Sequence, residues 1–415
     1  MKRIQRGQLR APTKVVDLEL SQLEASGDTT IPVDGYKCLW CLSRVGGIPA
    51  EISFWDVESE IEVKAKDIGD SRSAVERSRV EQSEVSRGNL SAITLTIAIC
   101  TRDHHVELRQ ALLSLREQTD RDFEVLVVDN APSSHLTAEV VEEINLARCE
   151  YVIEPIGGLA RARNTALAHT KTDYVAWIDD DEVADVNWVR SLKEGFAHSS
   201  DPVSVCGVML PAELETEAQI RFEQYGGFNK GRGLVPEILS ADSPSVISPL
   251  YPLPAFGSGG NMAFQVRALH SVGDFDRHLG AGTRTHSGEE TKAFAMLLRS
   301  GKVVLHWPKA ITWHYHRRDM AALQKQLYGI SAGLPAFYAS MIRSDPAVVV
   351  DMIRLAPHAL RDLGIRSGGI RSDQLPLDFP KELMRARRRG LLAGAFGYAY
   401  EVISGDSKPM SRVSR

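Results

Sequence analysis

The chain has 415 residues, of which 43% are hydrophobic and 25% are charged, values typical of a globular protein with room for roughly two or three domains. Its formal net charge of −5 argues against a nucleic-acid-binding protein, and no apolar run approaches the ~20 residues that a membrane-spanning helix needs. The basic start MKRIQRGQLRAPTK lacks the apolar stretch of a secretory signal, so we expect a cytoplasmic protein.

Residues 1–65 predict a small β-rich module, because apolar runs such as VVDLEL and KCLWCLSRV alternate with turn residues. Cys38 and Cys41 form a CxxC pair without a second pair or nearby histidines at metal spacing, which favours strand packing over a zinc site. Residues 66–90 are charged and rich in serine, which indicates an exposed helix or a linker.

Residues 91–318 predict an α/β domain. Apolar runs typical of buried strands occur at 93–99, 123–128, 151–154, 174–178 and 203–209, and helical stretches lie between them at 105–118, 138–147, 159–169 and 188–196. This alternation indicates a mostly parallel sheet flanked by helices. In such sheets ligands bind beyond the carboxyl ends of the strands.

Polar residues follow three of these strands, in the segments Thr101-Arg102-Asp103, Asp129-Asn130 and Asp179-Asp180-Asp181-Glu182. A helix cap needs one carboxylate, and that explanation is adequate for Asp103. It is poor for 179–181, because three adjacent carboxylates repel one another unless a cation neutralises them. Hard oxygen ligands suit Mg²⁺ or Mn²⁺, ions that are commonly shared with substrate phosphates. The run therefore predicts a metal–phosphate site.

A glycine pair precedes the predicted helix at 159–169. Gly157 and Gly158 allow close approach of a ligand to the backbone, and the N-terminus of the helix can bind an anion. Arg161 and Arg163 can hold a phosphate or a base edge. A plain helix entry with solvated arginines explains the same residues equally well.

Six segments occur in order between about residues 93 and 320: TIAICTRDH, FEVLVVDNAPSS, GGLARARNTAL, YVAWIDDDE, FGSGGNMAF and SGEETKAFAMLLRSG. Together they resemble glycosyltransferase family 2, the inverting transferases with a GT-A (Rossmann-like) fold. The resemblance implies a nucleoside diphosphate-sugar donor and a divalent metal, Mn or Mg.

The resemblance also implies roles for single residues. Thr101 and Asp103 would lie along the nucleotide, Asp129 would read the base, and Arg163 would contact the base or the diphosphate. Asp179, Asp180 and Asp181 would form the DxD element beside the donor. Asp181 would be the direct metal ligand, with Asp179 as a second one.

The second half of the resembling segment would hold the acceptor side. Asn261, at the end of the glycine-rich loop 257–260, would hydrogen-bond hydroxyls beside the donor sugar; a flexible turn is the alternative. Glu289 and Glu290 open a predicted helix where the family usually has Glu-Asp, the second acid being the general base. We expect Glu290 to be the base, with Glu289 as the alternative; first-turn acids that favour the helix dipole would look the same.

His314 and His316 lie two residues apart on a predicted strand, so both could face the site. A histidine at this place often completes the metal or diphosphate contacts in relatives, and imidazole is a common ligand for such ions. We expect His316 before His314 as a metal ligand, with ordinary packing as the alternative.

Residues 319–415 predict a helical region, in which Pro335 kinks or ends the first helix. Residues 384–403 join a basic cluster to an apolar stretch. This segment either packs on the core as a terminal helix or lies peripherally on the inner face of an anionic membrane.

The sequence thus predicts a metal-assisted inverting transferase that moves a sugar from a nucleoside diphosphate-sugar to a hydroxyl on a glycan, lipid or secondary metabolite. A nucleotidyltransferase is one alternative, although the glycine-rich basic loop usual after its first strand is missing here. A non-catalytic sugar-nucleotide-binding or scaffolding protein is another, and the acids at 179–181 and 289–290 speak against it. The donor sugar, the acceptor and the oligomeric state stay open.

Overall fold

The structure is a computed structural model that describes residues 1–22, 29–68, 90–228, 232–367, 370–371 and 375–405. Its largest described sheet has the strand order β11-β15-β12-β14-β10-β7-β8-β9, with β13 paired to β15. These strands are β7 (Leu95–Thr101), β8 (Glu124–Asn130), β9 (Cys149–Glu154), β10 (Tyr174–Ile178), β11 (Glu182–Ala184), β12 (Ser204–Pro211), β13 (Glu237–Leu239), β14 (Asn261–Gln265) and β15 (Val304–His314).

The sheet is mixed but runs mostly in one direction. Strands β9, β8, β7 and β10 are parallel neighbours, and β12 and β15 form another parallel pair. Between the two groups lies β14, antiparallel to both β10 and β12, and β11 and β13 pair antiparallel with β15. The predicted α/β fold class is confirmed. The alternation of strands and helices did not indicate the antiparallel strand β14 in the middle of the sheet.

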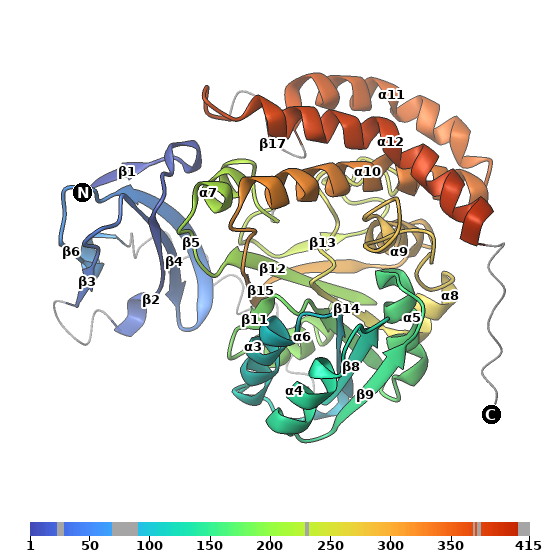
Figure 1. Cartoon of the computed structure of the whole chain (residues 1–415), viewed down its shortest axis with the longest axis horizontal. Coiled ribbons are helices and arrows are strands. Elements are labelled where there is room, and N and C mark those ends of the chain that lie inside the picture. Colours follow the sequence, from blue (N-terminus) through green and yellow to red (C-terminus); the bar gives the residue numbers. More distant parts are fainter. Residues whose placement is uncertain (23–28, 69–89, 229–231, 368–369, 372–374, 406–415) are drawn as a thin grey trace.

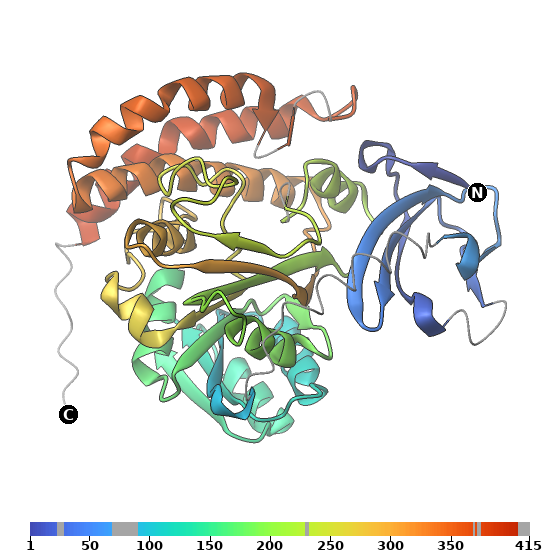
Figure 2. The ribbon, with the colours of Figure 1, turned by 180° about the vertical axis from the view of Figure 1, so that it is seen from behind.

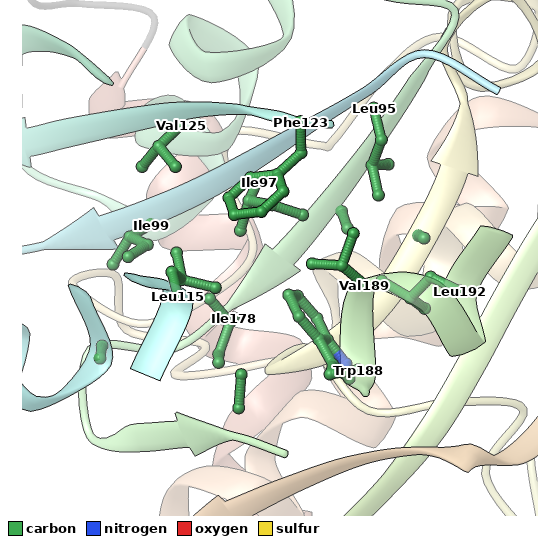
Figure 3. Close-up of a cluster of buried hydrophobic side chains, with 14 of the residues drawn as sticks. Leu95, Ile97, Ile99, Leu115, Phe123, Val125, Ile178, Trp188, Val189 and Leu192 are labelled. Carbon is green, nitrogen blue, oxygen red and sulfur yellow. The ribbon is translucent and has the colours of Figure 1, made fainter. Parts of the chain in front are cut away.

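Helices cover both faces of this sheet. The bounds are α3 (His105–Arg116), α4 (Leu136–Ile144), α5 (Leu159–His169), α6 (Trp188–Phe196), α7 (Glu217–Gln224), α8 (Val266–Ser271) and α9 (Glu289–Arg299). One buried cluster joins α3, α4 and α6 to one face, and a second joins α5, α8 and α9 to the other. Ile97 and Ile99 enter the first cluster (Figure 3) and Ala98 the second, the alternation of a strand buried on both sides.

A smaller four-stranded sheet stands beside the main one (Figure 1). Its order is β1-β5-β4-β2, from β1 (Lys2–Ile4), β2 (Thr13–Glu19), β4 (Cys38–Val45) and β5 (Ile48–Asp56), and β3 (Thr30–Pro32) pairs with β6 (Glu62–Lys64). Cys38 and Cys41 are buried on β4 in two different hydrophobic clusters. The sulfurs therefore face opposite sides of the strand, and the packing interpretation of this pair is confirmed.

The small sheet packs directly against the main sheet. Trp40 shares a hydrophobic cluster with Val208 and Ile311, and its ring lies edge-on to Trp313 at 6.4 Å. Beyond that cluster, Arg44 reaches across to the carboxylate of Asp185 at 2.6 Å. The domain division expected near residue 90 stays a prediction, and residues 69–89 of the expected linker lie outside the described residues.

Three long helices lie together along one side of the main sheet (Figures 1 and 2). They are α10 (Met320–Ser344), α11 (Val348–Ile365) and α12 (Lys381–Gly405), with the short pair β16 (Arg366–Ser367) and β17 (Ile370–Arg371) after α11. Of the two expectations for Pro335, an end of the helix is excluded, because α10 continues to Ser344, and a kink stays a prediction. Packing of α10 between α9 and α12 outweighs the missing proline N–H.

Helix α12 approaches α10 closely enough that glycine is required. A Cβ on Gly390 would lie 2.3 Å from the carbonyl oxygen of Tyr328, and one on Gly394 would lie 1.9 Å from that of Ala332. The two backbones are therefore in direct contact, as small residues at a helix crossing permit. No described helix is both long enough and apolar enough to pass through a bilayer.

Candidate functional site

The carboxyl ends of the central strands meet at one edge, as the sequence predicted. Thr101 at the end of β7 pairs in register with Asp129 on β8, and β10 ends at Ile178, directly before the acid run. A cavity of about 720 Å³ opens at this edge. Of the expected site residues it is lined by Thr101, Arg163, Asp179, Asp180, Asp181, Glu289, Glu290 and His314.

The first acid of the run is crowded by like charge. Burial is the main cause that raises the pKa of Asp179 to about 7, and the neighbouring carboxylates of Asp180, Asp181 and Glu290 add to it. The guanidinium of Arg163 opposes this rise from 3.7 Å away. The negative charge in this corner thus exceeds what the described protein groups neutralise.

Asp180 and Asp181 have cationic neighbours. The Nδ1 atom of His104 lies 3.3 Å from an Asp180 oxygen, and that hydrogen bond is the main cause of the raised pKa of His104. Asp181 lies 3.3 Å from the Arg317 guanidinium and 3.5 Å from His314 Nε2. Burial still raises the pKa of Asp181, with Arg317 as the largest opposing influence.

Glu182, the last acid of the run, is buried behind the other three. Both of its carboxylate oxygens lack a hydrogen-bond partner among the described residues. Its pKa is raised well above the usual value, mainly by burial and then by the charge of Asp179. The backbone of Gly260 passes so close that a Cβ there would lie 1.8 Å from the carboxylate of Glu182. Position 260 therefore has to be glycine, because any side chain there would clash with the carboxylate of Glu182.

Arg163 links the acid run to helix α9. Its Nη1 donates to Glu289 Oε1 at 2.7 Å, and its Nη2 donates to the carbonyl of Gly259 at 3.0 Å. The side chain is 1% exposed. This guanidinium, expected to contact the base or diphosphate, is thus also the buried counter-ion of two protein carboxylates.

The two acids that open α9 differ in environment. Glu289 is 3% exposed, and its Oε2 atom has no partner among the described residues. Burial, followed by the charge of Glu290, raises the pKa of Glu289 to about 8, with Arg163 opposing. Glu290 is partly exposed at the cavity wall, where its described hydrogen bond comes from the Thr291 hydroxyl at 3.5 Å. The carboxylate that is free to meet a ligand is therefore that of Glu290.

His314 is the last residue of β15 and His316 follows two residues later, and the two side chains lie at different depths from the cavity. His314 lines the cavity, whereas His316 lies behind it, 2% exposed. Their Nδ1 atoms are 2.8 Å apart, and His316 Nε2 lies 3.2 Å from Glu223 Oε1 on α7. Burial, and then the proximity of His316, lowers the pKa of His314 well below the usual value. The cavity is thus lined by His314 and not by His316, and the expected preference for His316 as a metal ligand stays a prediction.

Asn261 does not face the cavity, which corrects the expectation that it binds a sugar hydroxyl. Its amide nitrogen donates to the carbonyls of Val208 and Ala310 at 3.0 and 2.9 Å, and its oxygen accepts from the Trp188 indole at 2.9 Å. The side chain is fully buried. Asn261 therefore holds β14 against its neighbours.

Asp103 and Asp129 also lie outside the cavity wall. Asp103 accepts two hydrogen bonds from Ser133, each 2.9 Å long, and they lower its pKa. Asp129 is fully buried; its Oδ2 accepts from the Tyr151 hydroxyl at 2.8 Å, and burial raises its pKa. The other Asp129 oxygen, Oδ1, has no partner among the described residues.

Sequence reasoning did not single out several residues that complete this site. His104 and Arg317 were visible in the sequence beside named motifs, and Asn130, which follows Asp129, lines the cavity. Glu223 carried no signal, because its partner His316 lies 93 residues further along the chain. Among the described residues, no group of three or more His, Cys, Asp or Glu side chains forms a ready metal site.

Comparison with known proteins identifies the family of this region. Residues 96–247 match the model of the family described as "Glycosyl transferase family 2". The pre-mycofactocin glycosyltransferase of Mycobacterium tuberculosis is 28% identical over 247 residues, which cover 57% of this chain and 46% of that relative. Glycosyltransferase GlyA of Streptococcus pneumoniae is 25% identical over 144 residues, covering 34% of this chain and 18% of the relative.

This chain spans less than half the length of these curated relatives. Among solved structures, the mannosyltransferase PcManGT from Pyrobaculum calidifontis, in complex with GDP-Man and Mn²⁺, aligns with a TM-score of 0.45 and 19% identity. That alignment covers 75% of this chain and 79% of the mannosyltransferase. Residues 96–247 of this chain thus match glycosyltransferase family 2, and the curated relatives that the chain resembles are glycosyltransferases.

Proposed function

We propose that the protein transfers a sugar from a nucleoside diphosphate-sugar to an acceptor hydroxyl, with inversion at the anomeric carbon. One observation carries the proposal: the acid run 179–181 and the Glu289–Glu290 pair line the same cavity, with Arg163 buried between them. Such an arrangement places phosphate-handling groups and a proton acceptor around one space, as a displacement at a sugar carbon needs.

The nucleotide is proposed to bind at the ends of β7 and β8. Thr101 lines the cavity and has a buried Oγ1 atom without a partner among the described residues, and Asp129 lies next to it in register on β8. Unpaired buried groups are costly, so a ligand that pairs with them gains affinity. Asn130, which lines the cavity, already accepts a hydrogen bond from the Gly158 N–H at 2.8 Å and so positions the start of α5.

A divalent cation, Mn²⁺ or Mg²⁺, fits the chemistry of the acid run. Asp179 and Asp181 supply hard oxygen ligands, His314 supplies an imidazole nitrogen, and the crowding of the carboxylates 179–181 favours a cation. The run supplies only part of a coordination shell, and such ions usually take their remaining ligands from substrate phosphates and water. When bound, the ion would stabilise the charge that develops on the leaving diphosphate.

Glu290 is proposed to act as the general base. As the acceptor oxygen bonds to the anomeric carbon, Glu290 takes the hydroxyl proton and the bond to the diphosphate breaks, so the nucleoside diphosphate leaves with the electron pair. Glu289 is less suited, because its carboxylate is buried and paired with Arg163 at 2.7 Å. A single base and no covalent intermediate give inversion.

We also infer that α12 contacts an anionic membrane surface. Leu392, Phe396 and Ile403 are 76%, 80% and 77% exposed, and their helical spacing puts them on one face. Arg388 and Arg389 are exposed on the same face, towards the start of the helix. Apolar side chains beside arginines suit the boundary between anionic headgroups and acyl chains.

A donor screen tests the proposal. Nucleoside diphosphate-sugars are added with and without Mn²⁺, and the melting temperature is recorded, because a ligand that binds only the folded state raises it. We expect one donor to stabilise the protein more with Mn²⁺ than without, and to release its nucleoside diphosphate slowly in water. Release of pyrophosphate from a nucleoside triphosphate would instead support a nucleotidyltransferase. Donor binding without turnover on any acceptor would support a non-catalytic binding protein.

A further inference from the structure

The wall of the cavity changes character along the chain. The part contributed by residues 100–181 and 257–290 is rich in charged and backbone polar groups. The part contributed by the C-terminal helices and by the segments around Tyr225 and Tyr251 is mainly apolar or aromatic, and it includes Leu334, Tyr338 and Leu391. The second wall is therefore suited to a different ligand from the first.

An apolar wall discriminates between acceptor classes. A glycan presents hydroxyls on every side, and each hydroxyl buried against apolar atoms loses its hydrogen bonds to water without a replacement. An apolar body, in contrast, gains from the same contact in proportion to the area removed from water. Gln326 is an exception on this wall, because its buried Oε1 atom has no partner among the described residues and could accept one hydrogen bond from a ligand.

A cation from α12 also lines this second wall. Arg387 lines the cavity from α12 and lies beside the Tyr225 hydroxyl. No described carboxylate forms an ion pair with it, whereas Arg385 on the same helix pairs with Glu382 at 3.4 Å. A guanidinium forms its strongest hydrogen bonds with carboxylates and phosphates, so such a group on the ligand is its natural partner.

We propose that the acceptor is a hydroxyl compound with an apolar body and an acidic group. Its body lies along Leu334 and Leu391, its acid pairs with Arg387, and its hydroxyl points to Glu290. This inference rests on the proposed transferase function and narrows it, because it favours an amphipathic acid over a neutral glycan.

The test uses three acceptor probes with the donor that gives the largest stabilisation. They are the hydroxy acid 10-hydroxydecanoate, its uncharged counterpart decane-1,10-diol, and the neutral glycan maltotriose. Release of nucleoside diphosphate above the hydrolysis baseline gives the Michaelis constant for each probe, and calorimetry in the presence of the nucleoside diphosphate gives its binding. We expect the hydroxy acid to bind best, the diol more weakly, and maltotriose least.

The variant R387Q identifies the cation. We expect it to raise the Michaelis constant for the hydroxy acid by roughly tenfold or more, the loss of one charge-assisted pair, and to leave that for the diol nearly unchanged. R385Q is the matched control, because it makes the same charge change two residues away on the exposed side of α12. Donor stabilisation should be equal in the wild type and both variants.

The inference and the function can fail separately. If no nucleotide sugar binds or is hydrolysed, the transferase proposal fails. If the donor is hydrolysed but maltotriose is preferred, or neither the hydroxy acid nor the diol binds, the acceptor inference is overturned. It is also overturned if R387Q and R385Q behave alike. A 4-hydroxyphenylpropionate probe beside its methyl ester repeats the comparison with an aromatic body, so that a preference for chain shape is separated from the requirement for an acid.

Discussion

The Nδ1 atom of His314 lies 2.8 Å from the Nδ1 atom of His316, and one of the two must donate the proton between them. The contact of His316 with Glu223 determines which of the two histidines is the donor. Its carboxylate can only accept, so His316 carries a proton on Nε2, 3.2 Å away. With both rings neutral, His316 Nδ1 then accepts from His314, and the Nε2 lone pair of His314 is left facing Asp181, as metal ligation requires.

A substitution of Glu223 should therefore weaken metal binding, although Glu223 itself is not one of the proposed metal ligands. We expect E223A to lower the affinity for Mn²⁺ by roughly tenfold to 100-fold, the usual effect of losing an outer-shell partner. E223Q should retain most of the affinity, because its amide oxygen can still accept from His316. Electron paramagnetic resonance of free Mn²⁺, measured with the nucleoside diphosphate present, reads the affinity directly. Equal affinities in E223A and E223Q would contradict the tautomer argument.

The variants E290Q and E289Q each replace one acid of α9 by its amide, and we expect their effects to differ. E290Q is expected to lower kcat by roughly 100-fold or more, as the loss of a general base does, while donor stabilisation stays as in the wild type. E289Q should keep most of the transfer rate and alter mainly the free energy of unfolding, because Glu289 is the buried hydrogen-bond partner of Arg163. Transfer rates and chemical denaturation decide the roles, and the reverse pattern would assign the base to Glu289.

The acid run should make donor binding depend on the metal. D181A is expected to abolish the extra thermal stabilisation that Mn²⁺ gives to the donor complex, because it removes a carboxylate at the cavity wall. D319A is a suitable control, since Asp319 caps α10 through a hydrogen bond to Ala322 N at 2.8 Å. That variant should lower the melting temperature and keep the metal effect. A full metal effect in D181A would remove Asp181 from the metal site.

Glu289 also predicts a pH dependence of stability. Its pKa is raised to about 8 in the folded state, so the native protein holds a proton that the unfolded chain releases near its ordinary value. The stability from this group is present at pH values below the unfolded pKa and is lost as pH rises through about 8. In metal-free buffer the melting temperature of the wild type relative to E289Q should fall between pH 5 and pH 9. A difference that grows with pH would mean that Glu289 stays ionised beside Arg163.

The close contact of α12 with α10 can be tested by one methyl group. In G394A the new Cβ would lie 1.9 Å from the Ala332 carbonyl oxygen, so α12 must move outwards, at a cost of about 1–3 kcal/mol in the free energy of unfolding. The control is G233A, where nothing lies within 4 Å of the new atom. Denaturant titration of both variants checks the expectation, and equal effects would contradict it.

Membrane contact by α12 should need both parts of its exposed face. The double variant L392S/F396S is expected to stop co-sedimentation with vesicles that contain phosphatidylserine, and R388Q/R389Q should remove the preference over neutral phosphatidylcholine vesicles. L377S is the control, since Leu377 is fully exposed but lies outside α12. Binding that is unchanged in both double variants, or a concentration-dependent dimer that L392S/F396S dissolves, would reassign this face.

Local patterns predicted much of the fold. Helices α5 and α6 and strand β10 occupy the expected residues, because their apolar spacing and the boundaries around them are short-range properties of the chain. The position of β14 was not predictable in this way. It lies between β10 and β12 although it follows both in sequence, and that placement depends on pairing across more than 50 residues.

For the site, too, the sequence indicated residues with a local signal and missed contacts between residues that are distant in the chain. The acids 179–181 and Arg163 were found because they directly follow a strand or open a helix. Asn261 was misinterpreted, because a glycine-rich loop before it indicates space for a ligand, while its actual partners are carbonyls on other strands. Arg387 was interpreted as part of a surface basic cluster, and only the tertiary structure shows that it turns inwards, away from Arg388.

The cluster around Trp40 and the ion pair of Arg44 with Asp185 have a consequence for how the protein folds. Because the small sheet and the main sheet bury one another, they should melt in a single cooperative transition. A shortened chain that began at Leu90 would bare Ile311 and the rest of that cluster to water and leave Asp185 without its cation. Such a chain would be prone to aggregate, because the apolar cluster that the N-terminal strands cover would then be exposed to water.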